Sequence, residues 1–451
     1  MGKCSGTEEI ILLFDKYSLE SKNLHASFLA AGKDYPAAVI EDDGFLPDNV
    51  ISVYSYFLGD FKESAQIPGK PRYFNQITVP EYWEISANNS NGKVHDMNKE
   101  RGRIYYTEPA HKRLVKIVDW LDEKGVVRSS DHYNKYGALY ARTVFNAKGQ
   151  RVNKSYFSAD GKEIIVENYV TRNIILNEGE VVRIFQSKEE FVRYFLVKAG
   201  FEDKRIFFNS LSTPFLVSQR FKPGEKKDVL FWQEPVGNER PGNMRIILNG
   251  KSTRTCYIMV QRQDAYEKLL ALGANQEMLQ CLGFVYSLKR ENKHRPHALI
   301  CTNSDNIEQC EKLVKEIPKL HFHIAAVTEM STKLWELDVY DNVTLYPGVK
   351  ASVVEELFDK CDYYLDINHE KEILSAVQTA FMNNQVIFAF EETKHNLIYT
   401  AKEHLYKAAD ADRMIADLKA VLEDKKLADE CLTRQHQAAL LEEKEAFLQF
   451  A

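Results

Sequence analysis

Hydrophobic residues near the start of the chain fall into two short runs with a helical pattern between them. Residues 10–14 and 36–40 are apolar and predict buried strands, while apolar residues recur at helical spacing over residues 18–31. Gly32 follows that pattern and is expected to end the helix. This order of elements predicts a βαβ unit of an α/β layer.

The pattern changes after about residue 70, where aromatic and β-branched residues alternate with polar ones. Glycines within turn-forming sequences then recur at a constant spacing of 12 residues, at Gly125, Gly137, Gly149 and Gly161. Strand patterns of period two lie between them, for example over residues 138–145 and 164–169. Regular turns between alternating strands predict an antiparallel β-meander.

Helical periodicity returns over residues 191–196, and strand patterns follow at 205–208 and 228–232, so the meander is predicted to be inserted in the first α/β domain. A polar, charged stretch at 289–297 precedes five more apolar runs separated by helical segments. These runs cover residues 298–301, 323–327, 342–346, 363–366 and 386–390. They predict a second, parallel sheet, and an amphipathic stretch after residue 407 predicts helices packed on it.

This order resembles the GT-B architecture of glycosyltransferases, an α/β fold with two Rossmann-type domains around a cleft, here with an inserted antiparallel β-meander domain. The predicted divisions are residues 1–70 and 187–285 for the two parts of the first Rossmann-like domain, 71–186 for the meander, 286–430 for the second Rossmann-like domain and 431–451 for a C-terminal helix. Ligands of such sheets bind beyond the carboxyl ends of the strands.

Composition narrows the class of partner and the compartment. The chain has 59 basic and 65 acidic residues, a net charge of −6, so no overall field favours nucleic acid or an anionic membrane. Seven cysteines without a C-x-x-C pair predict reduced thiols. The sequence has no secretory leader and no apolar run approaching the roughly 18 residues of a spanning helix, so we expect a cytoplasmic protein.

The features that would bind a nucleotide sugar are missing. Retaining GT-B enzymes carry two glutamates eight positions apart around a glycine-rich turn, and the aligned residues here are Glu370 and Gln378, with a bulky, acidic turn over residues 371–373. Residues 298–301 run into Thr302 without an arginine or lysine to offset a diphosphate. No G-x-G-x-x-G or Walker-type loop occurs. We predict a degenerate donor site, no catalytic residue and no cofactor.

Polar residues at the predicted strand ends are the candidates for contacts in the cleft. They are Trp232, Gln233, Glu234, Asn243, Thr328, Glu329, Asn368, His369 and Glu370. His369 fits a helix cap and a cleft residue equally well. His321 and His323 lie in an apolar strand pattern without a carboxylate or thiol at ligand spacing, so we expect a structural role and predict no metal site.

Several longer segments resemble the GtfB family, the stabilising partners in the accessory-secretion O-GlcNAc transferase of Gram-positive bacteria. They are Leu-Phe-Asp at 13–15, Gly-Phe-Leu-Pro-Asp at 44–48, Tyr-Phe-Leu-Gly at 56–59, Ile-Val-Glu-Asn at 165–168, Leu-Phe-Trp-Gln-Glu-Pro at 230–235, Pro-Gly-Asn-Met at 241–244, Thr-Glu-Met at 328–330 and Leu-Asp-Ile-Asn-His at 365–369. The resemblance spans nearly the whole chain and leaves about ten N-terminal residues outside it.

The resemblance implies a partner, GtfA, that transfers GlcNAc from UDP-GlcNAc to serine and threonine hydroxyls of serine-rich repeat adhesins. It implies that this chain has no transferase activity alone, joins GtfA in a heterotetramer, helps hold the unglycosylated acceptor, and associates with the cytoplasmic membrane face. Two other readings stay open at this point. One is an active retaining glycosyltransferase that uses Glu370. The other is a sugar- or glycopeptide-binding module without a transferase partner.

Overall fold

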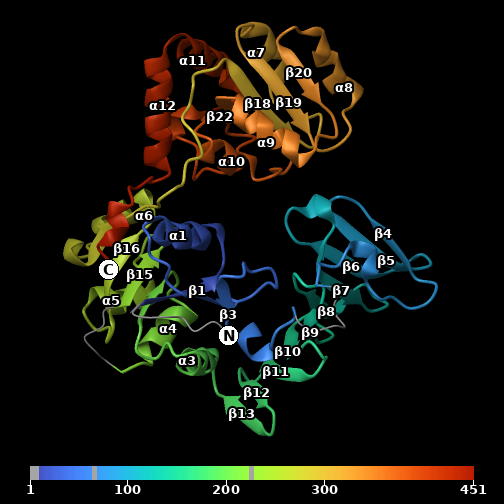
Figure 1. Ribbon diagram of the computed structural model, residues 1–451, viewed down its shortest axis with the longest axis vertical. Coiled ribbons are helices and arrows are strands. Elements are labelled where there is room, and N and C mark those ends of the chain that lie inside the picture. Colours follow the sequence, from blue (N-terminus) through green and yellow to red (C-terminus); the bar gives the residue numbers. More distant parts are fainter. Residues whose placement is uncertain (1–9, 63–68, 223–227, 451) are drawn as a thin grey trace. The chain divides into compact units, whose positions relative to one another are not determined.

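The computed structural model describes residues 10–62, 69–222 and 228–450 (Figure 1). The chain forms two compact units, residues 1–281 and residues 282–451. The expected N-terminal extension of about ten residues falls almost entirely on residues 1–9, outside the described part. None of the helices within the described residues has the length and apolar character needed to span a bilayer.

The first unit contains a seven-stranded parallel sheet in the order β17-β16-β15-β14-β1-β2-β3. Its strands are β1 (Ile10–Lys16), β2 (Ala37–Glu41), β3 (Val50–Ser52), β14 (Arg205–Phe208), β15 (Asp228–Trp232), β16 (Thr255–Val260) and β17 (Leu279–Cys281). Its helices are α1 (Leu19–Ala30), α2 (Ser55–Leu58), α3 (Lys188–Lys198), α4 (Thr213–Gln219), α5 (Gly242–Leu248) and α6 (Gln263–Ala271). The predicted strand and helix at the start of the chain are confirmed, with Ser18 capping α1 and Gly32 at a positive φ just after it.

A ten-stranded antiparallel sheet separates β3 from β14 in the chain, and each of its strands pairs with the next. The strands are β4 (Glu84–Ala87), β5 (Asn91–Asp96), β6 (Lys99–Tyr106), β7 (Val115–Leu121), β8 (Val127–Tyr133), β9 (Leu139–Phe145), β10 (Arg151–Phe157), β11 (Glu163–Asn168), β12 (Ile174–Glu178) and β13 (Val181–Phe185). The four regularly spaced glycines all have positive φ in the hairpin turns, as a turn that requires the left-handed region favours. The predicted inserted meander is therefore confirmed.

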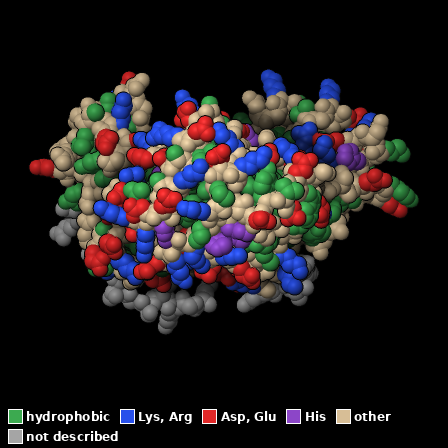
Figure 2. All heavy atoms as spheres, turned by 90° about the horizontal axis from the view of Figure 1, so that it is seen from above, with side chains coloured by type: hydrophobic (Ala, Val, Ile, Leu, Met, Phe, Trp, Pro, Cys, Tyr) green, Lys and Arg blue, Asp and Glu red, His purple; other side chains and the backbone are tan. Residues whose placement is uncertain are grey.

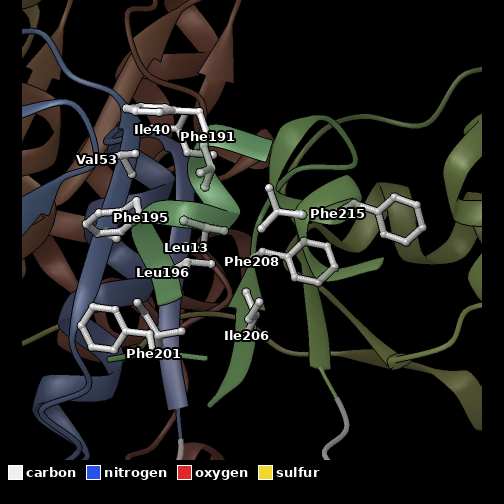
Figure 3. Packing of buried hydrophobic residues seen from close by; sticks show 14 of the residues in the cluster. Leu13, Ile40, Val53, Phe191, Phe195, Leu196, Phe201, Ile206, Phe208 and Phe215 are labelled. Carbon is white, nitrogen blue, oxygen red and sulfur yellow. The ribbon is translucent and has the colours of Figure 1, made fainter. Parts of the chain in front are cut away.

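The core of the first unit joins the parallel sheet to one face of the meander. Leu13 and Phe208 of neighbouring strands pack with Phe191 and Phe195 of α3, as Figure 3 shows. Tyr156 of β10 belongs to the same core and stacks on Tyr54, with ring centroids 4.5 Å apart. Burial of large aromatic side chains on this scale is the main stabilising contribution, and it holds the meander against the α/β layers.

The second unit is built on a six-stranded parallel sheet in the order β20-β19-β18-β21-β22-β23. Its strands are β18 (His297–Thr302), β19 (His321–Ala326), β20 (Val343–Tyr346), β21 (Tyr363–Asp366), β22 (Val386–Phe390) and β23 (Leu405–Tyr406). Its helices are α7 (Cys310–Glu316), α8 (Thr332–Trp335), α9 (Ala351–Lys360), α10 (Ala376–Met382), α11 (Ala411–Glu423), α12 (Lys425–Ala438) and α13 (Glu445–Leu448). The prediction of two parallel α/β sheets and an antiparallel meander is confirmed.

The predicted C-terminal helix over residues 431–451 is wrong in its extent. Helix α12 begins at Lys425 and ends at Ala438, and Leu440 then adopts a left-handed conformation with φ of 51°. The following residues run beside Phe284, whose main chain bonds to Leu440 and Glu442. A side chain at Gly283 would collide with the Leu440 carbonyl oxygen, so the glycine permits this close approach. Pairing with this segment stops the helix.

Candidate functional site

A cavity of about 450 Å³ lies at the carboxyl ends of two strands of the first sheet. It lies beyond β1 and β2, where open parallel sheets bind their ligands. Its lining comprises Lys16, Tyr17, Ser18, Lys22, Glu41, Asp42, Asp43, Phe45, Leu46, Pro47 and Lys116. Lys116 belongs to β7, so the meander completes one wall of the cavity. We call this set of residues the first-sheet cavity.

Charges of both signs line the first-sheet cavity. The Lys116 ammonium lies 2.7 Å from the Asp43 carboxylate, and Lys16 lies 3.4 Å from Glu41. These side chains are 30% to 72% exposed, so the pairs contribute little to folding and stay available to a ligand. A mixed set of donors and acceptors of this kind suits peptide groups and hydroxyls better than a strongly charged ligand.

Aromatic and helix-end groups form another part of the same lining. The Tyr17 hydroxyl lies 2.9 Å from Nδ1 of His25, and burial raises the pKa of Tyr17 to about 12. Lys22 lies over the Tyr17 ring at 5.9 Å from its centroid. The tyrosine therefore stays a neutral hydroxyl at physiological pH and offers an apolar face beside a cation.

The Asp42 carboxylate fixes the loop that follows β2. It accepts hydrogen bonds from the Gly44 N–H at 2.6 Å and from the Ser55 hydroxyl at 2.9 Å. The acidic run that begins at Glu41 directly follows the apolar residues 36–40 and is the signal in the sequence for this site, because acidic residues directly after a buried strand lie at the ligand-binding edge.

The predicted site residues of the first unit lie at the end of β15 and the start of α5. The Gln233 amide accepts a hydrogen bond from Asn209 at 2.8 Å and donates one to Gln261 at 2.8 Å. These two bonds link the ends of β14, β15 and β16. Trp232 is buried and its indole N–H has no hydrogen-bond partner. Asn243 donates to the Leu211 carbonyl, and Glu234 is exposed. None of the four is among the residues that line the first-sheet cavity.

The carboxyl edge of the second unit's sheet is filled by its own side chains. The Thr302 hydroxyl donates to Oδ1 of Asn368 at 2.8 Å, and the Asn368 amide donates to the Glu370 carbonyl at 3.1 Å. Asn368 is buried. Nε2 of His369 lies 2.6 Å from Glu308 and donates to that carboxylate, which makes His369 part of an exposed pair and not a helix cap.

A carboxylate occupies the helix end that would face a diphosphate in a donor site. Oε1 of Glu372 accepts the Val377 N–H at 2.9 Å, at the N-terminus of α10. Burial raises the pKa of Glu372, the Val377 N–H opposes that change, and the charge of Asp366 adds to it. The extra acidic residue that the sequence placed in this turn thus satisfies the helix N-terminus from within the protein.

His395 closes the same edge from a second loop. Its Nδ1 donates to Oδ1 of Asp366 and its Nε2 donates to the Glu370 carbonyl, both at 2.5 Å. A neutral imidazole has one N–H, so two bonds to acceptors favour the charged ring. Burial alone would lower the pKa of His395, but the bond to Asp366 and its charge outweigh burial, and the pKa is raised.

The remaining predicted residues, Thr328 and Glu329, follow β19. The Thr328 carbonyl accepts the Gly348 N–H at 3.0 Å, and Glu329 is exposed. The structure therefore brings Asn368, His369 and Glu370 together in one loop. Thr328 and Glu329 lie on the loop after a different strand of the same sheet.

The three histidines of β18 and β19 form hydrogen bonds inside the sheet. Nδ1 of His297 lies 3.0 Å from Nε2 of His323, whose Nδ1 lies 3.0 Å from the Tyr346 hydroxyl. His321 bonds Thr344 in the same way at 2.7 Å. Burial lowers the pKa of His323 to about 3, so the ring is neutral. Within the described residues, no group of three or more His, Cys, Asp or Glu side chains could hold a metal ion.

Acidic and basic side chains intermingle over the face of the molecule shown in Figure 2. Such a surface produces no extended field of one sign. Together with the net charge of −6, it favours ligands recognised by hydrogen bonds and shape over polyanions.

Domain models of known protein families match segments of both units. Family models match the GtfB N-terminal domain at residues 11–57, the GtfB middle domain at 83–186, the GtfB third domain at 188–272 and the GftB/GlyA-F C-terminal domain at 298–435. A chain of the crystal structure of the GtfA/B complex bound to UDP and GlcNAc superposes with a TM-score of 0.90 and 42% identity, covering 98% of each chain. These matches confirm the family resemblance.

Two curated relatives carry the same name, UDP-N-acetylglucosamine–peptide N-acetylglucosaminyltransferase stabilizing protein GtfB. The protein of Streptococcus gordonii is 44% identical over 418 residues, which cover 92% of this chain and 91% of the relative. The protein of Streptococcus pneumoniae is 40% identical over 433 residues, which cover 95% and 96%. The chain therefore belongs to the GtfB family of stabilising proteins of peptide N-acetylglucosaminyltransferases, and its part in that system is that of the stabilising protein and not of the transferase.

Proposed function

We propose that the chain binds the unglycosylated, serine- and threonine-rich acceptor and presents it to a GtfA-type partner, which transfers the first GlcNAc from UDP-GlcNAc. The acceptor in this proposal is a serine-rich repeat adhesin awaiting accessory Sec export. The two subunits act as a heterotetramer in the cytoplasm, at the cytoplasmic face of the membrane. The chain supplies binding and stabilisation, and its partner supplies the chemistry.

The observation that carries this proposal is the contrast between the two sheet edges. The first-sheet cavity is open and lined by hydrogen-bonding groups of both charges, as a peptide with many hydroxyls requires. The equivalent edge of the second unit is filled by Glu372, Asn368 and His395. This contrast supports an acceptor peptide over a nucleotide sugar as the ligand of this protein.

The meander offers a second mode of binding to an extended peptide. Its edge strand β13 carries exposed Val181, Val182 and Ile184, with exposures of 48%, 60% and 58%. An unpaired strand edge can hydrogen-bond to the main chain of a peptide whose small side chains offer little grip. Because ordering a flexible acceptor costs entropy, we expect repeats bound together to hold more tightly than one repeat alone.

We propose that the strand-end residues act in two ways. Those with exposed side chains, Glu234, Glu329, His369 and Glu370, contact the acceptor directly. The remaining residues, Trp232, Gln233, Asn243, Thr328 and Asn368, hold the loops that carry these contacts. This division follows from exposure, because a ligand reaches an exposed side chain more readily than a buried or half-buried one.

The test is transfer of radiolabelled GlcNAc to a serine-rich repeat peptide by this chain alone, by GtfA alone and by both. We expect activity that depends on GtfA and rises strongly when this chain is added. The Glu370→Gln variant should still support that activity. Transfer by this chain alone that is lost in Glu370→Gln would instead establish the retaining transferase. Equal affinities for single-repeat and multi-repeat peptides would contradict the proposal that avidity contributes to acceptor binding.

A further inference from the structure

Lys154 of β10 is a half-buried lysine on the face of the meander that packs against the α/β layers. Its ammonium lies over the ring of Tyr156, 4.8 Å from the centroid, and Tyr156 belongs to the core that joins the meander to those layers. Residues two apart in a strand point to the same side of a sheet, so Lys154 lies on that side as well. Thr143 of β9 and Glu167 of β11 flank it in register. The lysine therefore lies where a polar group needs a partner.

The two carboxylates whose charges act on Lys154 are engaged elsewhere. Oε1 of Glu167 lies 3.0 Å from Nζ of Lys188, and Oε2 accepts the Tyr169 hydroxyl at 3.3 Å. Asp42 is bonded within the loop that follows β2. Among the described residues, no group accepts a hydrogen bond from the Lys154 ammonium or forms an ion pair with it. Its three donors are left for water or a ligand.

The surroundings of Lys154 disfavour its positive charge. Burial lowers the pKa of Lys154 to about 8. The charges of Glu167 and Asp42 oppose this change, and the positive charge of Lys188 adds to it. A partly desolvated cation is stabilised most by a ligand of opposite charge, because that ligand replaces the interactions that water no longer supplies. An anion therefore suits this position better than a neutral group.

Arg151 of the same strand adds a second cation. Its guanidinium lies over the Tyr169 ring, 5.9 Å from the centroid, and its side chain is exposed. Its charge acts on both Lys154 and His132, so the two cations lie close to one another. No carboxylate in the described part of the chain pairs with Arg151. We call Arg151 and Lys154 the β10 cation pair. A guanidinium beside an ammonium matches a carboxylate, because both can donate to its two oxygens.

The β10 cation pair lies near the first-sheet cavity. Asp42 lines that cavity, and its charge acts on Lys154. Lys116, which lines the cavity from the meander, lies on β7, three strands away from β10 in the sheet. Three strand spacings amount to about 14 Å, which about four residues of an extended peptide span. A peptide held in the cavity can therefore reach the β10 cation pair.

An unmodified peptide carries negative charge only in its aspartate and glutamate side chains and at its C-terminus. We propose that the β10 cation pair binds the carboxylate of an aspartate or glutamate in the Ser/Thr-rich acceptor. The pair thereby favours repeats that carry an acidic side chain about four residues from the segment in the first-sheet cavity. This inference rests on the proposed function, because it concerns the same ligand.

The test compares two fluorescent Ser/Thr-rich repeat peptides that differ in one residue per repeat, glutamate in one and glutamine in the other. Fluorescence anisotropy measures their affinity for the complex of this chain with GtfA, without UDP-GlcNAc. We expect the glutamate peptide to bind about tenfold more tightly, and this preference should decrease as the ionic strength rises. Equal affinities at low ionic strength would overturn this inference and leave acceptor binding intact. If neither peptide bound, the proposed function would fail and this inference with it.

Variants identify the residues responsible for the preference. Lys154→Met keeps the apolar stem and removes the charge, so its melting temperature should not fall, and it should bind the two peptides within about twofold of each other. Lys154→Arg keeps a cation and should retain the preference. Arg151→Gln, at an exposed position, should lower the preference severalfold. The matched control is Lys148→Gln in the exposed turn before β10, which should leave the preference unchanged. A full preference for glutamate in both Lys154→Met and Arg151→Gln would contradict the proposal.

Discussion

The carboxyl edges of the two parallel sheets differ in what occupies them. At the first sheet, lysines and carboxylates line an open cavity, and Asp43 in its pair with Lys116 has a side chain that is 48% exposed. At the second unit's sheet, Asp366 is 3% exposed and is bonded to His395, while Glu372 caps α10. Ionic groups at the first edge are available to a ligand, whereas Asp366, His395 and Glu372 at the second edge make their bonds within the fold.

This difference shows how the carboxyl edge of a parallel sheet can be stabilised by side chains of the protein itself. Parallel sheets leave unsatisfied groups at the helix N-termini along the carboxyl edge, and a bound anion would ordinarily satisfy them. Here Glu372 accepts one N–H at the N-terminus of α10, and His395 fixes the loop before it through the Glu370 carbonyl.

We call the carboxyl edge of the second unit's sheet the closed edge and that of the first sheet the open edge. The largest expected effect comes from removing a hydrogen-bond acceptor at the closed edge. Asp366→Ala removes two hydrogen bonds to His395 and one partner of a buried ion pair, so we expect the unfolding free energy to fall by about 3 kcal/mol. Urea denaturation measures this loss. The matched variant at the open edge is Asp43→Ala, whose exposed pair should contribute less than about 1 kcal/mol. Equal losses in the two variants would show that the edges do not differ in this way.

The second effect concerns function at the open edge. Replacing both Lys116 and Asp43 by alanine should lower GtfA-dependent transfer to a repeat peptide about tenfold, equivalent to roughly 1.4 kcal/mol of lost binding, while thermal stability stays nearly unchanged. The rate at subsaturating peptide measures it. Lys162 and Asp160 form an exposed pair on another hairpin of the meander, and their double alanine variant is the control. Equal transfer in both double variants would place the acceptor elsewhere.

Much of the fold could be predicted from the sequence because it depends on local patterns. The 12-residue spacing from Gly125 to Gly161 determines where hairpins turn, and the apolar runs identify most strands of the two parallel sheets. The strands β3, β16, β17 and β23 were not predicted, and three of these four have only two or three residues. The C-terminal helix was overextended because pairing of Leu440 and Glu442 with Phe284 is a tertiary contact that no local pattern contains.

The candidate site was harder to predict than the fold. Strand ends predicted the carboxyl edges of the sheets as candidate sites, but not which side chains remain open there. Gln233 and Asn368 look alike in sequence to ligand-binding amides, and the structure uses both inside the protein. Lys116 lies about 70 residues from Asp43 in the chain, and only the packing of the meander brings them together. Long-range pairs of this kind leave no spacing that a single sequence could reveal.

A smaller effect is expected from removing the hydrogen-bond acceptor at the N-terminus of α10 in the second unit. Glu372→Ala leaves the Val377 N–H without its acceptor and should cost about 1 kcal/mol, whereas Glu372→Gln keeps an acceptor oxygen and should cost less. Chemical denaturation compares the two. We also expect that UDP-GlcNAc does not raise the melting temperature of either variant, because the loop after β18 offers no basic side chain over residues 302–306. A rise with UDP-GlcNAc in Glu372→Ala would mean that this carboxylate alone excludes the donor.

The smallest effect is a pH dependence at the closed edge. The pKa of His395 is raised above its usual 6.5, so its stabilising contribution is fully present below that pH and is lost as the pH rises through the folded-state pKa. His323, with a pKa lowered to about 3, acts in the opposite direction, since its contribution is lost as the pH falls below 6.5. The difference in unfolding free energy between the parent protein and His395→Gln isolates the first effect.

We expect that difference to shrink by about 1 kcal/mol between about pH 6 and about pH 9. His436 provides the control, because burial lowers its pKa and it bonds a neutral amide. The corresponding difference for His436→Gln should not shrink over the same range, since the ring is already neutral at the lower pH. A constant difference for His395→Gln would mean that the ring is uncharged in the fold. One of its two hydrogen bonds would then be absent, and the closed edge would rest on Glu372 and Asn368 alone.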